Sequence, residues 1–202
     1  MAEGTKEVAA FILAGGKSSR MGADKAFVEF EGRTLLARAL EVARSVTPDV
    51  RIVGDAERFA AFAAVVEDVF RGCGPLGGIH AGLRASEAEL NLVLAVDLPF
   101  VSWAWLRYLI GRAQAERDAV AVVPRAGGWQ PLCAVYRREF ADAAEEALRA
   151  GQCKIDALFG RVKTVAIGEE ELAGAGFAAR VFCNLNTREE LESARVLRCA
   201  SG

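Results

Sequence analysis

A glycine-rich segment with several cations follows the first apolar run of the chain. Residues 13–25 read Leu-Ala-Gly-Gly-Lys-Ser-Ser-Arg-Met-Gly-Ala-Asp-Lys. Glycines let backbone N–H groups approach an anion without obstruction by a Cβ atom. Lys17, Arg20 and Lys25 add three cations within nine positions, enough to meet a triphosphate. The segment therefore predicts a phosphate-binding loop, and a glycine-rich turn with solvated lysines is the alternative.

Two well-known phosphate loops are excluded by single residues. Gly16-Lys17-Ser18 resembles the end of a P-loop, but that motif needs a glycine where Phe11 stands. The dinucleotide fingerprint G-x-G-x-x-G fails as well, because a glycine two positions after Gly15 is required and Lys17 is found there. The loop must therefore bind phosphate in another way.

Asp97 follows an unbroken apolar run, Leu92–Val96, of the kind expected for a central strand buried on both faces. Open parallel sheets bind ligands at the carboxyl ends of their strands, and Pro99 stops this strand with Asp97 at that edge. Mg²⁺ is commonly held by one or two carboxylates together with substrate phosphates. Asp97 is therefore a candidate magnesium ligand, and a cap for the next helix is the alternative.

Short β-branched runs alternate with helical patterns, which indicates an α/β fold with helices on both faces of a mostly parallel sheet. We expect one three-layer domain over residues 1–202 and a turn at Glu31-Gly32. Strands are predicted at Val8–Leu13, Val50–Val53, Ala64–Val66, Leu92–Val96, Ala119–Val123, Leu132–Tyr136, Val162–Ile167 and Val181–Asn184. Helices are predicted around Leu35–Ala43, Leu76–Leu83, Trp103–Ile110, Phe140–Leu148 and, after a capping box at Thr187 and Glu190, Leu191–Leu197.

The composition excludes several classes of function. The chain has 202 residues, of which 52% are hydrophobic and 26% charged, as expected for a globular protein with a full core. Its net charge of -2 argues against a general nucleic-acid binder. No apolar run approaches the ~20 residues that cross a bilayer, and the charged residues 1–7 do not form a secretory signal. We expect a cytoplasmic protein.

The cysteines and the single histidine offer little for catalysis. The five cysteines form no C-x-x-C pair, so we expect reduced thiols and neither a metal cage nor a disulfide framework. His80 has no G-x-S-x-G motif to accompany it, and we expect it on a helix surface. The protein is therefore expected to catalyse its reaction without histidine.

Five segments carry a resemblance to a known family. The leader L-A-G-G-x-S-x-R-M-G-x-D-K resembles the signature of the nucleotidyltransferases of the MobA family, the molybdenum cofactor guanylyltransferases. The other segments, in order, are Gly74-Pro75-Leu76-Gly77-Gly78, Val96-Asp97-Leu98-Pro99, Gln130-Pro131-Leu132 ahead of Tyr136, and Asn184-Leu185-Asn186-Thr187. Together they span residues 8 to about 197. The family usually has proline where this chain has Arg188.

The resemblance implies a Rossmann-like nucleotidyltransferase fold and assigns roles to residues. The catalytic residues would be Lys25, which stabilises charge on the α-phosphate, Arg20, which meets the departing pyrophosphate, and Asp97, the magnesium ligand. The N-terminal part would bind the nucleotide and the C-terminal part the acceptor. The implied nucleotide contacts are Leu13, Ala14, Gly15, Gly16, Lys25, Asp55, Asp68, Gly77, Gly78 and Asp97, and the implied acceptor contacts are Asn184 and Asn186.

Some of these assignments have alternatives in the sequence. Glu67 stands beside Asp68 and is the other carboxylate that would accept hydrogen bonds from a base or ribose. Asp55 stands where the family often has asparagine. Gly77 and Gly78 would let the backbone lie flat against a base, or simply form a helix entry. Asn184 and Asn186, two apart at the end of a predicted strand, would read the pterin or its phosphate, or form Asx turns.

The activity implied is transfer of GMP from GTP to molybdenum-bearing molybdopterin, with Mg²⁺, release of pyrophosphate and formation of the guanine dinucleotide cofactor. Molybdenum-cofactor biosynthesis proteins and apo-molybdoenzymes are the implied protein partners, with no nucleic acid and no membrane. A cytidylyltransferase or another nucleotidyltransferase for a phosphorylated acceptor is one alternative, and a non-catalytic nucleotide-binding module is another. A GTPase is excluded, because neither a P-loop nor an Asn-Lys-x-Asp motif occurs.

Overall fold

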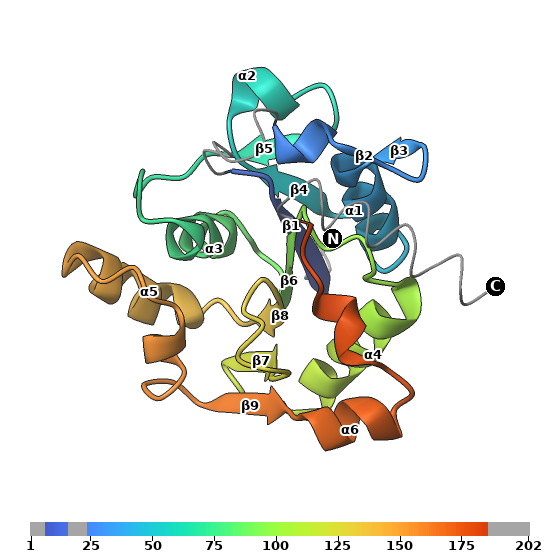
Figure 1. Ribbon diagram of the computed structural model, residues 1–202. Helices are drawn as coiled ribbons and strands as arrows, with labels where there is room; N and C mark the ends of the chain where they lie inside the picture. Colours follow the sequence, from blue (N-terminus) through green and yellow to red (C-terminus); the bar gives the residue numbers. More distant parts are fainter. Residues whose placement is uncertain (1–6, 16–23, 186–202) are drawn as a thin grey trace, which may run out of the picture.

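A seven-stranded sheet forms the centre of the computed structural model, which describes residues 7–15 and 24–185 (Figure 1). The strand order is β5-β4-β1-β6-β8-β7-β9. Only β8 runs antiparallel to its neighbours within this sheet of the described residues, so the predicted mostly parallel α/β fold is confirmed. The strands are β1 (Val8–Leu13), β4 (Val50–Val53), β5 (Ala64–Val66), β6 (Leu90–Ala95), β7 (Ala121–Pro124), β8 (Cys133–Tyr136) and β9 (Thr164–Ile167).

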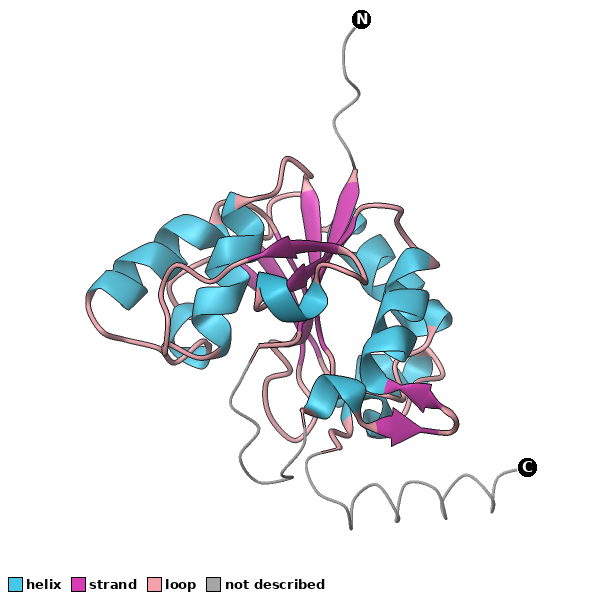
Figure 2. Ribbon diagram, turned by 90° about the horizontal axis from the view of Figure 1, so that it is seen from above, coloured by secondary structure: helices cyan, strands magenta, loops and turns pink. Residues whose placement is uncertain are grey.

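Helices cover both faces of the sheet, and the alternation of side chains along β1 shows why both faces are apolar. Ala10 and Ile12 belong to a core with α1 (Leu35–Arg44), α4 (Trp103–Ala115) and α6 (Glu169–Gly174). Phe11 and Leu13 point to the opposite face, toward α3 (Pro75–Arg84) and α5 (Phe140–Arg149). The helices on either side of the sheet are apparent in Figures 1 and 2.

Helices α1 and α4 each begin at a residue whose side chain satisfies one of the first N–H groups. The hydroxyl oxygen of Thr34 accepts from the N–H of Ala37 at the start of α1, and that of Ser102 accepts from the N–H of Trp105 at the start of α4. Helix α3 begins differently, with Pro75 in its first turn after Gly74, whose φ of 63° favours glycine.

The turn predicted at Glu31-Gly32 is confirmed, and it joins two strands that the sequence does not reveal. Strands β2 (Glu29–Phe30) and β3 (Arg33–Thr34) pair antiparallel around this two-residue turn. Positive φ angles at Glu31 (51°) and Gly32 (74°) are those of the tight hairpin turns that match strand twist. Two residues a strand are too few to show an alternating pattern. The short helix α2 (Ala56–Phe59) was not predicted either, because its four residues are too few to show a helical pattern.

Seven of the eight predicted strands are found, with ends that differ by at most two residues from the prediction. The strand predicted at Val181–Asn184 is wrong: residues Ala179–Phe182 form a 3-10 helix. The ring of Phe182 packs on Trp105 of α4 at a centroid distance of 5.4 Å, and Phe177 packs there at 5.1 Å. The apolar side chains of this segment therefore pack on α4 and do not belong to a strand of the sheet. The helix predicted at Leu191–Leu197 lies outside the described residues.

Of the helices in the described part of the chain, none is both long enough and apolar enough to cross a membrane.

Trp105 provides a test of this packing, because it is fully buried and its ring contacts those of Phe177 and Phe182. Its Nε1–H also donates to the Sγ of Cys133 at 3.2 Å. We expect Trp105→Ala to lower the free energy of unfolding by about 3–5 kcal/mol. Trp103→Ala is the matched control, since Trp103 is 56% exposed on the same helix, and its cost should stay below about 1 kcal/mol. Denaturant unfolding measures both, and equal costs would contradict the described packing.

Candidate active site

The carboxyl ends of four neighbouring parallel strands meet at one edge of the sheet and bring distant segments together. The N–H of Ala14 donates to the carbonyl of Val53 at 3.1 Å, and the N–H of Val96 donates to that of Leu13 at 3.2 Å. These bonds tie the segments after β1, β4 and β6 to one another. Ligands of open α/β sheets bind at such an edge, and most predicted site residues of the described chain follow these strands.

Lys25 and Asp97, which are 72 residues apart in sequence, form an ion pair at this edge. The Nζ of Lys25 lies 3.0 Å from the Oδ2 of Asp97, and the two side chains are 25% and 15% exposed. Partial burial strengthens their attraction beyond that of a fully solvated pair. The two charged residues expected from the sequence to act on a triphosphate are therefore adjacent.

A short local structure holds Lys25 in place. Lys25–Phe27 forms a 3-10 helix whose first turn is capped by Asp24, which accepts from the N–H of Ala26 at 3.2 Å. Asp24 also forms an ion pair with Arg58 of α2, and Ala26 is buried. The sequence does not indicate this contact of Arg58, because nothing in the pattern links α2 to the loop that carries Lys25.

The beginning of the glycine-rich loop lies at the same edge. Leu13 and Ala14 are buried, and Gly15 is exposed. Among the described residues, a Cβ added at Gly15 would make only ordinary contacts, the nearest at 3.8 Å from the carbonyl oxygen of Val53. Gly16 and Arg20 lie outside the described residues.

Asp68 lies against the first turn of α3. Its Oδ1 accepts from the N–H of Phe70 at 2.8 Å, and its Oδ2 would be 2.6 Å from a Cβ added at Gly77. Burial raises the pKa of Asp68, although the hydrogen bond from Phe70 opposes this shift. Asp68 is half-buried whereas the adjacent Glu67 is exposed, so Asp68 is the carboxylate that points toward α3.

Gly77 and Gly78 are both buried, and a side chain at either position would crowd its neighbours. At Gly77 a side chain would collide with the carboxylate of Asp68. At Gly78 an added Cβ would lie 3.3 Å from Leu13 and 3.4 Å from Val53, which is tighter than most packing contacts. The two glycines therefore let α3 approach the sheet edge and Asp68 closely.

The remaining predicted contacts lie around this edge. Asp55 is exposed and caps α2 by accepting from the N–H of Glu57 at 2.9 Å. Asn184 is exposed and follows the 3-10 helix, so the expected strand end is wrong, but the N–H of Leu185 donates to the carbonyl of Asp97 at 3.1 Å. Asn184 therefore sits beside the loop of Asp97. Asn186 lies outside the described residues.

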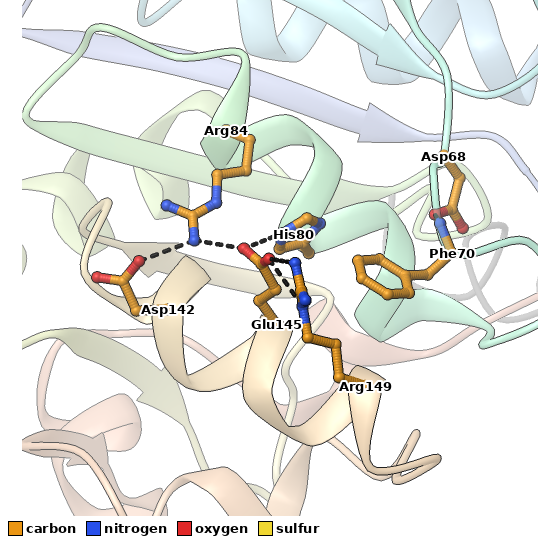
Figure 3. Close-up of polar contacts among 7 residues, drawn as sticks. All are labelled: Asp68, Phe70, His80, Arg84, Asp142, Glu145 and Arg149. Atoms are coloured by element: carbon orange, nitrogen blue, oxygen red, sulfur yellow. Dashed lines mark hydrogen bonds and ion pairs between the residues drawn. The ribbon is translucent and has the colours of Figure 1, made fainter.

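His80 is not on a helix surface as expected, because α5 covers that face of α3 (Figure 3). It is only 5% exposed, and its Nε2 lies 3.5 Å from the Oε2 of Glu145 on α5. Glu145 in turn receives hydrogen bonds at 2.6 Å from Arg84 and from Arg149. These two arginines lower the pKa of Glu145 to about 2.

A lysine–carboxylate pair at the ligand-binding edge of an α/β sheet is suited to a nucleoside triphosphate with its metal ion. The family described as "MobA-like NTP transferase domain" matches residues 10–165. The chain belongs to this family of nucleotidyltransferases.

Individual relatives agree with the family match. The chain is 36% identical to a molybdenum cofactor guanylyltransferase from Desulfosudis oleivorans, over 93% of this chain and 94% of that protein. It is 37% identical to a probable molybdenum cofactor guanylyltransferase from Pelotomaculum thermopropionicum, over 92% and 91%. The crystal structure of molybdopterin-guanine dinucleotide biosynthesis protein A from Archaeoglobus fulgidus is similar with a TM-score of 0.82 and 28% identity, over 96% and 100%.

The fold is shared more widely than the family. A 2-C-methyl-D-erythritol 4-phosphate cytidylyltransferase from Thermus thermophilus is similar with a TM-score of 0.68 at 20% identity, over 95% of this chain and 98% of that one. The predicted nucleotidyltransferase fold is therefore confirmed.

The low pKa of Glu145 leads to a prediction about pH. Its folded pKa of about 2 is below the ordinary value of 4.5, so its stabilising effect is complete above about pH 4.5 and is lost as the pH falls toward 2. We expect Glu145→Gln to lower the thermal midpoint at pH 7, and the difference from the unsubstituted protein to shrink below pH 4.5.

Glu146→Gln, at the neighbouring and mostly exposed position, is the matched control for the loss of one carboxylate. A Glu145→Gln difference that is independent of pH would mean that the arginine contacts do not stabilise the charged carboxylate.

Proposed function

We propose that this protein transfers GMP from GTP to the phosphate of molybdenum-bearing molybdopterin, releasing pyrophosphate and forming the molybdopterin guanine dinucleotide cofactor. The observation that carries the proposal is the pairing of Lys25 with Asp97 at the carboxyl edge of β1 and β6. A nucleotidyl transfer needs charge neutralisation and positioning more than proton chemistry, and these two side chains supply both without a histidine.

Lys25 would act on the α-phosphate. As the acceptor phosphate attacks, negative charge builds on the α-phosphate oxygens, and a preorganised ammonium stabilises that charge without moving. The ion pair with Asp97 and the Asp24 cap hold Lys25 in place before the nucleotide arrives. Arg20 would meet the departing pyrophosphate.

Asp97 fits the expected magnesium ion. In the described part of the chain no three His, Cys, Asp or Glu side chains gather as a closed metal cage, and Mg²⁺ in nucleotide sites needs only one or two carboxylates besides the phosphates. Asp97 offers one hard oxygen donor at the edge and would hold the ion, which, when bound, neutralises charge on the triphosphate. Lys25 beside it would share the same phosphate oxygens.

The segments around α3 would bind the nucleoside. The N–H groups of the first turn of a helix have no partner within it. In α3 this turn includes Gly77, whose N–H would donate to O6 of guanine, with Gly78 next to it in the same site. Asp68 would accept from the N1–H and N2–H₂ groups. Leu13, Ala14, Gly15 and Gly16 would follow the ribose and phosphates with their backbone, and Asp55 would lie at the rim of this site.

The acceptor would occupy the other side of Asp97. The hydrogen bond from the N–H of Leu185 to the carbonyl of Asp97 holds the neighbouring Asn184 beside the Asp97 loop. Asn184 and Asn186 would bind polar groups of the pterin or its phosphate. The protein would act in the cytoplasm and pass its product to molybdenum-cofactor biosynthesis proteins or apo-molybdoenzymes.

The magnesium assignment is tested by Asp97→Asn. The amide keeps the shape of the side chain and removes its charge, so we expect the fold to persist and turnover to fall on the order of 10²-fold or more. Pyrophosphate release with GTP, molybdopterin and limiting Mg²⁺ measures turnover. Asp118→Asn is the control, since Asp118 is 84% exposed and pairs only with Lys163 in the described structure. Unchanged activity of Asp97→Asn would remove Asp97 from the ligand role.

The choice of base tests the guanylyl transfer itself. A site built to pair with guanine leaves buried groups unpaired when cytosine enters, which rejects the wrong base by several kcal/mol. In a competition assay with Mg²⁺ and molybdopterin we expect clear preference for GTP over CTP and ATP, and Asp68→Ala should reduce it. Equal or better turnover with CTP would identify a cytidylyltransferase in place of the proposed activity.

A further inference from the structure

His80 occupies a position that its polarity makes unfavourable. It is 5% exposed between α3 and α5, yet its Nδ1 has no hydrogen-bond partner among the described residues. A buried polar atom without a partner costs free energy, and an apolar residue would fill the same space. Packing alone therefore does not account for a histidine here.

One side of the imidazole is held by α5. Its Nε2 lies 3.5 Å from the Oε2 of Glu145, at the limit of hydrogen-bonding distance. Glu145 is fixed by Arg84 and Arg149, and Arg84 also contacts Asp142 at 2.8 Å. Figure 3 shows this network of charged residues beside the histidine.

The other side of the imidazole meets Phe70. The two rings pack edge to face, with centroids 5.1 Å apart and an interplanar angle of 80°, a favourable geometry for aromatic pairs. The backbone N–H of Phe70 is the donor to Asp68, at 2.8 Å. His80 thus contacts the residue whose N–H fixes the carboxylate of Asp68, as seen in Figure 3.

The turn Asp68–Phe70 is held against α3 at two points of one helix face. Gly77 and His80 are three residues apart, so they lie on the same side of α3. Gly77 admits the carboxylate at its first turn, and His80 supports the Phe70 ring one turn further along. A carboxylate held in such a fixed position can accept hydrogen bonds from one base in preference to another.

We propose that His80 is a positioning residue for guanine selectivity: braced by Glu145, it supports Phe70 and thereby fixes the carboxylate of Asp68. This inference rests on the proposed function, in which Asp68 accepts hydrogen bonds from the guanine base. His80 itself contacts neither the base nor the reacting phosphates.

The test compares GTP with ITP, which lacks the N2 amino group. Calorimetry with each nucleotide gives a ratio of dissociation constants, which Asp68→Ala should reduce. We expect His80→Leu, which fills the site without an aromatic ring, to reduce the ratio about threefold to tenfold. The kcat at saturating GTP should stay unchanged, because Lys25 and Asp97 are untouched. His80→Gln, which also lacks a ring, replaces His80→Leu if that variant does not fold.

A double-mutant cycle of His80 and Phe70 distinguishes a positioning role from a general loss of stability. If His80 acts through Phe70, then Phe70→Leu should have the same effect, and the double variant should be no worse than either single one. Leu83→Ala, which removes a buried side chain from the same helix, is the control; it should lower stability and leave the ratio unchanged.

Two outcomes would overturn the inference, and they are distinguishable. If Asp68→Ala reduces the ratio and the folded His80 variants do not, His80 has no positioning role and the proposed function stands. If Asp68→Ala leaves the ratio unchanged, the assignment of Asp68 to the base is wrong, and the role of His80 is lost with it.

Discussion

The ion pair of Lys25 and Asp97 is the contact on which the rest of the site depends. Its members come from segments after β1 and β6, which are neighbours in the sheet although far apart in sequence. The helices that connect the strands lie on the two faces of the sheet. The carboxyl edge is thereby left to the loops, and the two charges meet there, partly buried and 3.0 Å apart.

Close packing shapes the part of the edge that is proposed to bind the nucleotide. Gly77 and Gly78 let α3 pack closely against Asp68, Leu13 and Val53. The start of this helix therefore lies at the proposed binding site of the nucleoside. On the side of α5, the buried His80 and the arginines that pair with Glu145 lie behind this turn. A fixed geometry of this kind lets hydrogen bonds discriminate between bases.

Much of this could be predicted from the sequence, because the signals are local. The apolar run before Asp97 and the glycines after β1 are each readable within a few residues, and the placement of Lys25 near Asp97 follows from parallel strands ending at one edge. The predictions that failed concern residues whose environment is determined by partners far away in the sequence. Val181–Asn184 has the composition of a strand, yet its aromatic residue, Phe182, packs on Trp105. His80 is buried by a helix more than sixty residues further on, and no local pattern shows that.

The most direct test of this account is the effect of Lys25→Ala on catalysis and on binding. If Lys25 acts on charge that develops in the transition state, kcat should fall much more than the affinity for GTP measured by calorimetry. A loss of GTP affinity with unchanged kcat at saturation would contradict the account and would make Lys25 a ground-state contact of the nucleotide.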